Sequence, residues 1–245
     1  MAVLLLLRAA PRTIWPILVG LGVISLGIDL AARRMGVPLD GPQLASSTWV
    51  YLAVMSLVTS TVAGGVLHIL LTGRGPRGLD AGFLGFVIWT AGVTLLANGM
   101  MSMTQSAPTA PPTQLLPRFA LVAVGGVGGA IVLTRLMLLP MAWLVGDPGA
   151  TAAGSWGRMR GQLVGYIVAS LLLSLPVVMV GVLAVGAAGG SEGELTPGAR
   201  IAAQVMAVVM AALSAGLNAV MYLRLVGAPR RLGEVFDDGP DFPSR

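Results

Sequence analysis

The chain has 245 residues, of which 56% are hydrophobic and only 10% are charged, and its mean hydropathy is +0.86. A soluble domain carries about 25% charged residues, so this composition excludes water as the main solvent. The formal net charge is +5, and the fifteen basic residues are all Arg, placed mostly at the ends of apolar stretches. These positions favour a role in membrane topology, so we expect no nucleic-acid partner.

Cysteine is absent and His68 is the single histidine. The sequence therefore excludes disulfides, thiol catalysis and Cys-based metal sites, and one histidine cannot form a His-rich metal site. Phosphate-loop, zinc-protease and hydrolase-nucleophile motifs are also missing from the sequence. We expect no metal, no cofactor and no enzymatic activity.

Six apolar stretches follow one another along the chain, each long enough for the roughly 20 residues that a membrane-spanning helix needs. They cover 13–32, 48–71, 81–103, 119–144, 163–188 and 201–226. The pattern predicts an all-α fold, a polytopic transmembrane bundle of six helices within residues 1–226. Residues 227–245 are polar and are expected to form a disordered tail.

The distribution of Arg between the loops predicts the orientation. With the N-terminus inside, ten Arg residues fall on the inner side and four on the outer side, Arg33 and Arg34 among the four. Both termini are therefore predicted to be cytoplasmic. The use of Arg without any Lys favours a GC-rich bacterial source, so we expect the protein in the bacterial cytoplasmic (inner) membrane.

Small residues predict where helices approach each other. Gly125 and Gly129 form a GxxxG pair in the fourth stretch, and Ser56, Ser60 and Gly64 recur every four residues in the second. We interpret both patterns as packing faces within the bundle. The GxxxG pair also allows an alternative, the seam of a homo-oligomer.

A charge within an apolar stretch is costly and marks a candidate site. Arg135 is the strongest case, and we expect it in the inner third of the bilayer. The candidate lipid or ligand contacts, all expected near the inner surface, are Arg135, Trp156, Arg158, Arg160, His68, Asn218, Tyr222 and Arg224. The guanidinium of Arg can donate two parallel hydrogen bonds to a phosphate. These residues therefore predict a basic pocket for an anionic headgroup or a phosphate-bearing solute. The alternative is that Arg135 snorkels to headgroups or ties the bundle together.

A short interfacial helix is expected after Asp147, carrying Trp156, Arg158 and Arg160 at headgroup level before the fifth span. The alternative is a plain connector anchored by one Trp and two Arg residues.

A second polar group is expected at the outer side, where Asp29, Asn98 and Gln204 would line a cavity of a small transporter or permease subunit. His68 with Asp80 is the one acid–base pair that an enzyme could use. Neither belongs to a recognisable motif.

The second half carries a series of short elements: Thr134–Leu136, Leu139–Pro140, Ser155–Gly161 and Tyr222–Leu225. Over about residues 120–237 the chain resembles a bacterial family of six-helix membrane proteins. That family is related to the YciC-like proteins and to the membrane domain found beside glycerophosphodiester phosphodiesterases. In those fusions the membrane domain is not the catalytic part.

The resemblance implies a non-enzymatic membrane module, in which the positions that match the pattern are Arg135, Trp156, Arg160 and Tyr222. We therefore predict an integral membrane protein that contacts anionic lipid or a partner membrane protein. A small transporter or permease subunit is the alternative.

Overall fold

The computed structural model describes residues 14–37, 46–75, 80–105, 112–147, 150–187 and 196–227, together with residues 12 and 78. Side chains at 98–105, 112–123 and 185–187 lie outside this description. Of the expected tail at 227–245 only Gly227 is described, and the side chain of Asn98 is not among the described parts.

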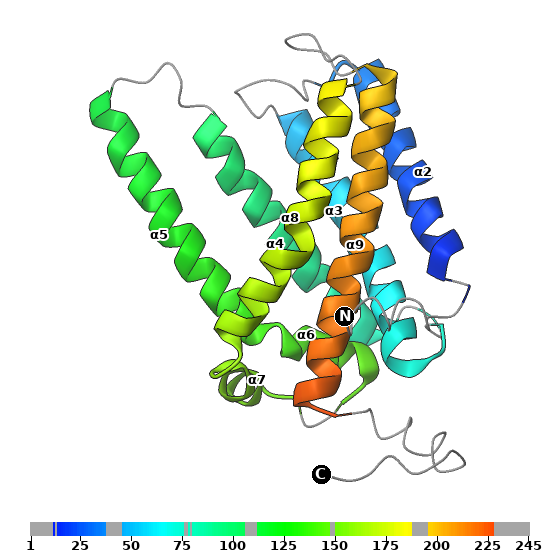
Figure 1. The fold of residues 1–245 in the computed structure, drawn as a ribbon, viewed down its shortest axis with the longest axis vertical. Helices are drawn as coiled ribbons and strands as arrows, with labels where there is room; N and C mark the ends of the chain where they lie inside the picture. Colours follow the sequence, from blue (N-terminus) through cyan, green and yellow to red (C-terminus); the bar gives the residue numbers. More distant parts are fainter. Residues whose placement is uncertain are drawn as a thin grey trace.

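The described part of the chain consists of helices and turns, without a strand (Figure 1). Its eight helices are α2 (Ile14–Arg34), α3 (Ser46–Thr72), α4 (Ala81–Gln105), α5 (Pro112–Leu136), α6 (Leu138–Val145), α7 (Ala152–Met159), α8 (Leu163–Ala187) and α9 (Pro197–Leu225). The predicted all-α fold is confirmed.

Five segments are long and apolar enough to cross a membrane: Ile14–Arg34, Ser46–Thr72, Val124–Val145, Leu163–Ala184 and Pro197–Leu225. Ala81–Ala97 in α4 is a shorter apolar helix. Apolar side chains cover much of the outside of these helices, most of all on α8, where none of the residues in its apolar window is buried. This surface is compatible with a multi-pass membrane protein.

One predicted stretch, 119–144, differs from the structure because it is divided at Met137 into α5 and α6. The Met137 N–H turns back to the Thr134 carbonyl oxygen at 3.4 Å. Pro140 has no N–H to continue the helical ladder, which favours the break. In Figure 1, α6 runs across the lower end of the bundle instead of extending α5.

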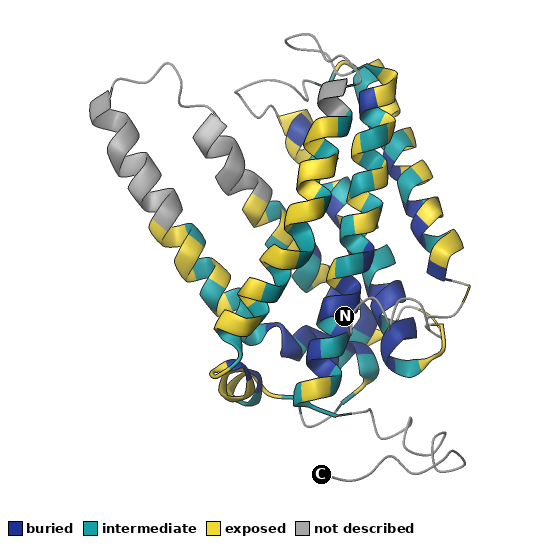
Figure 2. Cartoon of the chain, viewed as in Figure 1, coloured by how far each residue is buried: buried dark blue, intermediate teal, exposed yellow. Residues whose placement is uncertain are grey.

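The buried residues gather at this lower end, around α6 and the adjoining parts of α3, α4 and α9 (Figure 2). Tyr222, Leu67, Leu71 and Met159 are among the largest side chains there that are almost fully enclosed. Towards the opposite end of the bundle, most side chains of α8 and α9 are exposed or only partly buried. The buried core therefore lies where α6 and α7 meet α3, α4 and α9.

In α3 the small residues Ser56, Ser60 and Gly64 are all buried. A Cβ on Gly64 would lie 3.0 Å from Cδ1 of Phe86 in α4, so glycine permits a close helix contact. By contrast, a Cβ on Gly129 would meet nothing within 4 Å. Within the described chain, the GxxxG position Gly129 is not pressed against another helix, and the oligomer seam stays a prediction for Gly125 and Gly129.

Candidate functional site

The end of α5 and the short helix α7 form the junction that contains Arg135 and Trp156. Thr151 caps α7 by accepting a hydrogen bond from the Gly154 N–H at 3.0 Å, as an N-cap threonine should. In the next turn, the Ser155 hydroxyl donates to the carbonyl oxygen of Arg135 at 2.8 Å. The short helix expected from the sequence is therefore present, and it is bonded to the last turn of α5.

Arg135 places its guanidinium over the ring of Trp156, with Cζ 4.7 Å from the ring centroid. Such a cation–π contact contributes about 0.5–2 kcal/mol, depending on how far it is desolvated. The Nε atom of Arg135 is buried and has no hydrogen-bond partner. Among the residues that the structure describes, Arg135 has no carboxylate partner either. Its charge is thus held in place by an aromatic face and not by an acid.

Arg160 follows α7 directly and keeps helical backbone angles, so it shares the side of Trp156 at a spacing of four. Both side chains are exposed. Arg135 and Trp156 are therefore in direct contact, and Arg160 lies one helical turn from Trp156 on the same side of α7. We call these three residues the arginine site.

Arg158 lies elsewhere, because a spacing of two residues turns it to the other side of α7. It lines a cavity of about 30 Å³ between α6, α7 and the end of α9, together with Asp147, Thr151 and Ser155. This space is large enough for a water molecule and has several polar partners for one. The structure separates Arg158 from the arginine site.

Tyr222 is only 1% exposed and packs in the core at the lower end of the bundle. One turn earlier, Asn218 accepts a hydrogen bond from the Tyr166 hydroxyl of α8 at 2.8 Å. The predicted common face of Asn218 and Tyr222 therefore points inward. Both residues contribute to helix packing and not to an open surface.

We expect Tyr166→Phe to lower the free energy of unfolding by about 1 kcal/mol, since interhelical hydrogen bonds in membrane proteins contribute on that order. Unfolding of the purified protein in mixed micelles measures the change. Ser174→Ala is the matched control on α8, because that hydroxyl donates only to Leu171 of its own helix. Equal stability of the Tyr166 and Ser174 variants would contradict a stabilising hydrogen bond between α8 and α9.

His68 and Asp80 each serve a local turn and do not pair with each other. The Nδ1 atom of His68 lies 3.0 Å from the Arg74 carbonyl oxygen and 3.2 Å from the Thr72 hydroxyl, just after α3. Asp80 accepts the Phe83 N–H at 2.7 Å and thereby caps α4. Arg224 is exposed in the last turn of α9. These contacts give a structural role to His68, and in the described part of the chain no hydrogen bond or ion pair joins Arg224 to the arginine site.

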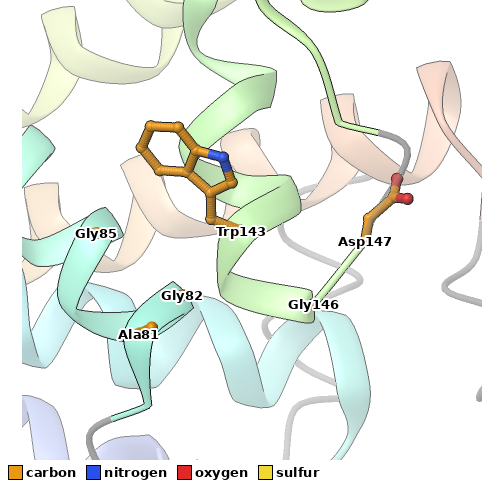
Figure 3. A pocket seen from close by; sticks show the side chains of 6 residues that line it. All are labelled: Ala81, Gly82, Gly85, Trp143, Gly146 and Asp147. Carbon is orange, nitrogen blue, oxygen red and sulfur yellow. The ribbon is translucent and has the colours of Figure 1, made fainter.

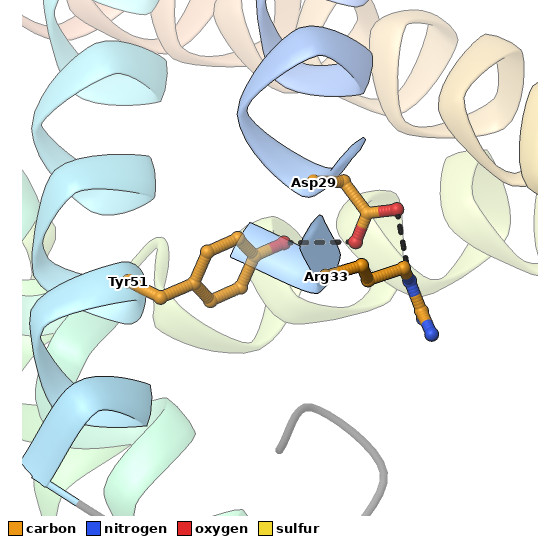
Figure 4. A network of polar contacts seen from close by, with 3 residues as sticks. All are labelled: Asp29, Arg33 and Tyr51. Carbon is orange, nitrogen blue, oxygen red and sulfur yellow. Dashed lines mark hydrogen bonds and ion pairs between the residues drawn. The ribbon is translucent and has the colours of Figure 1, made fainter. Parts of the chain in front are cut away.

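The polar group at the opposite end joins α2 to α3 (Figure 4). Asp29 is bonded through one oxygen to Arg33 Nε at 3.3 Å and through the other to the Tyr51 hydroxyl at 3.5 Å. Gln204 is partly buried on α9. Asp29 therefore links α2 to α3 through its hydrogen bond with Tyr51. The transporter alternative stays a prediction.

A larger, open pocket of about 510 Å³ lies where α4 meets the end of α6 (Figure 3). Its walls are Ala81, Gly82, Gly85, Trp143, Gly146 and Asp147. The indole of Trp143 and the carboxylate of Asp147 point in different directions in this view. Since a ligand pocket needs polar groups that converge, we regard this hollow as a by-product of the close α4–α6 contact.

The described residues contain no cluster of three or more His, Asp or Glu side chains that could hold a metal ion. The sequence analysis did not identify two residues that bond predicted site residues. They are Ser155, which bonds Arg135, and Tyr166, which bonds Asn218. Ser155 stands directly before Trp156, which is a usable signal, whereas nothing in the sequence indicates that Tyr166 bonds Asn218.

No family model, no curated protein and no solved structure matches this chain. The resemblance over residues 120–237 is thus neither confirmed nor refuted by comparison, and the function has to be inferred from the geometry.

Proposed function

We propose that this chain is a non-enzymatic bacterial inner-membrane protein that binds the phosphate-bearing headgroup of an anionic lipid at the arginine site. In this proposal the protein has six spans with both termini in the cytoplasm, and the site lies at the inner surface. The observation that carries the proposal is the Arg135 guanidinium, which is stacked on Trp156 and has no acidic partner among the residues that the structure describes.

An unpaired arginine is costly in an apolar setting. A buried donor that lacks an acceptor costs about 1–3 kcal/mol, and a charge at membrane depth costs more. A phosphate oxygen supplies both the missing acceptor and the opposite charge. Because Nε is shielded, the terminal amino groups of Arg135 are the donors that would meet the phosphate.

The stacking on Trp156 prepares this contact. The ring fixes the plane of the guanidinium, so less side-chain freedom is lost when two parallel hydrogen bonds to a phosphate form. Arg160 adds a second positive charge on the same side of α7. Together the two cations favour a headgroup with net negative charge over a zwitterionic one.

Helix α7 also has the character of an interfacial helix. Ser155 and Met159 face the protein, whereas Trp156 and Arg158 are exposed. Trp and Arg are the residues that suit the headgroup level of a bilayer. This supports a membrane lipid as the source of the phosphate.

The test is retention of dioleoyl-phosphatidylglycerol by the detergent-purified protein, measured by native mass spectrometry. We expect Arg135→Gln to weaken retention at least tenfold, since a hydrogen bond to a charged group contributes about 1.5–3 kcal/mol and 1.4 kcal/mol corresponds to a factor of ten. Arg12→Gln removes the same charge from an exposed residue before α2 and should retain the lipid like the wild type.

Two further ligands show whether the bound phosphate group belongs to an anionic lipid or to a soluble compound. Dioleoyl-phosphatidylcholine has the same chains without net charge, and sn-glycerol 3-phosphate has the phosphate without chains. Equal retention of both phospholipids, or equal retention by Arg135→Gln and the wild type, would refute the proposal. Displacement of the lipid by sn-glycerol 3-phosphate at similar concentration would redirect it to a soluble phosphate ligand.

A further inference from the structure

The break between α5 and α6 leaves a backbone group without a helical partner. In a continuous helix the Arg135 carbonyl would accept the N–H of Leu139. Because α5 ends at Leu136, this carbonyl belongs to the last turn, whose oxygens have no partner within the helix. A buried carbonyl of this kind needs a donor from elsewhere.

Ser155 supplies that donor from α7. Its hydroxyl donates to the Arg135 carbonyl at 2.8 Å, and the residue is only 6% exposed. Thr151 caps the Gly154 N–H and so fixes the first turn of α7. This turn positions Ser155 opposite the Arg135 carbonyl. The bond therefore joins α5 to α7 through two residues that are 20 positions apart in the chain.

The same two segments meet a second time through the next residue. While Ser155 bonds the backbone of Arg135, Trp156 stacks under the side chain of Arg135. Two contacts between the same pair of segments fix both the distance between α5 and α7 and their rotation. Without the Ser155 bond, the position of the guanidinium over the ring would lose one of its restraints.

We infer that Ser155 is the positioning residue of the arginine site, acting through the Arg135 carbonyl to hold the guanidinium over Trp156. This inference rests on the proposed function, because it assigns a role within the same site. Ser155 itself need not touch the ligand.

A double-mutant cycle tests the inference, with dioleoyl-phosphatidylglycerol as the probe and the variants Ser155→Ala, Arg135→Gln and their combination. We expect Ser155→Ala to weaken lipid affinity about fivefold, which corresponds to about 1 kcal/mol. The combined variant should bind no more weakly than Arg135→Gln alone, because the two residues act on one contact. Ser155→Thr, which keeps the hydroxyl, should recover most of the affinity.

The unfolding transition of each variant is measured beside the affinity. If Ser155→Ala does not fold, Ser155→Cys repeats the experiment with a similar volume and a weaker donor. Ser174→Ala on α8 is the control, since its hydroxyl bonds only its own helix.

The outcomes separate the two proposals. Lost stability with unchanged affinity in Ser155→Ala, or additive losses in the combined variant, would overturn the positioning role and leave the proposed function intact. Full lipid affinity in Arg135→Gln would overturn both.

Discussion

Replacing Gly82 by valine is expected to separate α4 from α6 and to lower the free energy of unfolding by about 3 kcal/mol, the upper part of the usual range for overpacking. A Cβ at this position would overlap the carbonyl oxygen of Trp143. That oxygen belongs to the backbone of α6, so it cannot rotate away as a side chain would. Unfolding of the purified protein in mixed micelles measures the change.

Gly92 provides the matched control on the same helix, because a Cβ there would meet nothing within 4 Å. Gly85→Ala should have an intermediate effect, since its Cβ would lie 3.3 Å from Cε3 of Trp143, whose ring has some freedom to adjust. If Gly82→Val and Gly92→Val unfolded alike, the close contact between α4 and α6 would be refuted.

Truncation of Tyr222 should also be severe. The side chain is 1% exposed, and removing a buried aromatic ring leaves a cavity that costs about 3–5 kcal/mol. Tyr222→Ala is therefore expected to unfold at a much lower denaturant concentration than the wild type. Tyr222→Phe retains the ring and should keep most of the stability, together with full retention of phosphatidylglycerol.

This pair of variants distinguishes a packing residue from the lipid contact that the sequence suggested. Loss of lipid in Tyr222→Phe, with a normal unfolding transition, would make the hydroxyl part of a binding site. Normal retention would limit Tyr222 to the core.

The helices were largely predictable because their lengths are determined by a simple physical requirement. A stretch of about 20 apolar residues bounded by polar ones identifies a span, and the expected range 163–188 compares with Leu163–Ala187 in α8. The break at Met137 was not predictable, since proline is common in membrane helices and Pro140 alone does not say whether a helix bends or ends. The direction of α6 depends on packing against α4, which no local pattern encodes.

The site was predictable only in part. Arg135 stood out because a charge in an apolar stretch is costly, and Trp156 because it lies next to basic residues. The helical period could have separated Arg158 from Trp156 in advance. It could not tell that the shared face of Asn218 and Tyr222 is turned inward, because both faces of a membrane helix are apolar and only tertiary contacts distinguish them.

The location of the core has a consequence for recognition. Met159, at the end of α7, is fully enclosed in the same cluster as Tyr222 and Leu71. The helix that carries Trp156 is therefore anchored in the buried core through Met159, while the side chains at the other end of the bundle are more exposed. In the proposed function, the headgroup would meet a helix whose backbone is already held in place by the core, so less conformational entropy would be lost on association.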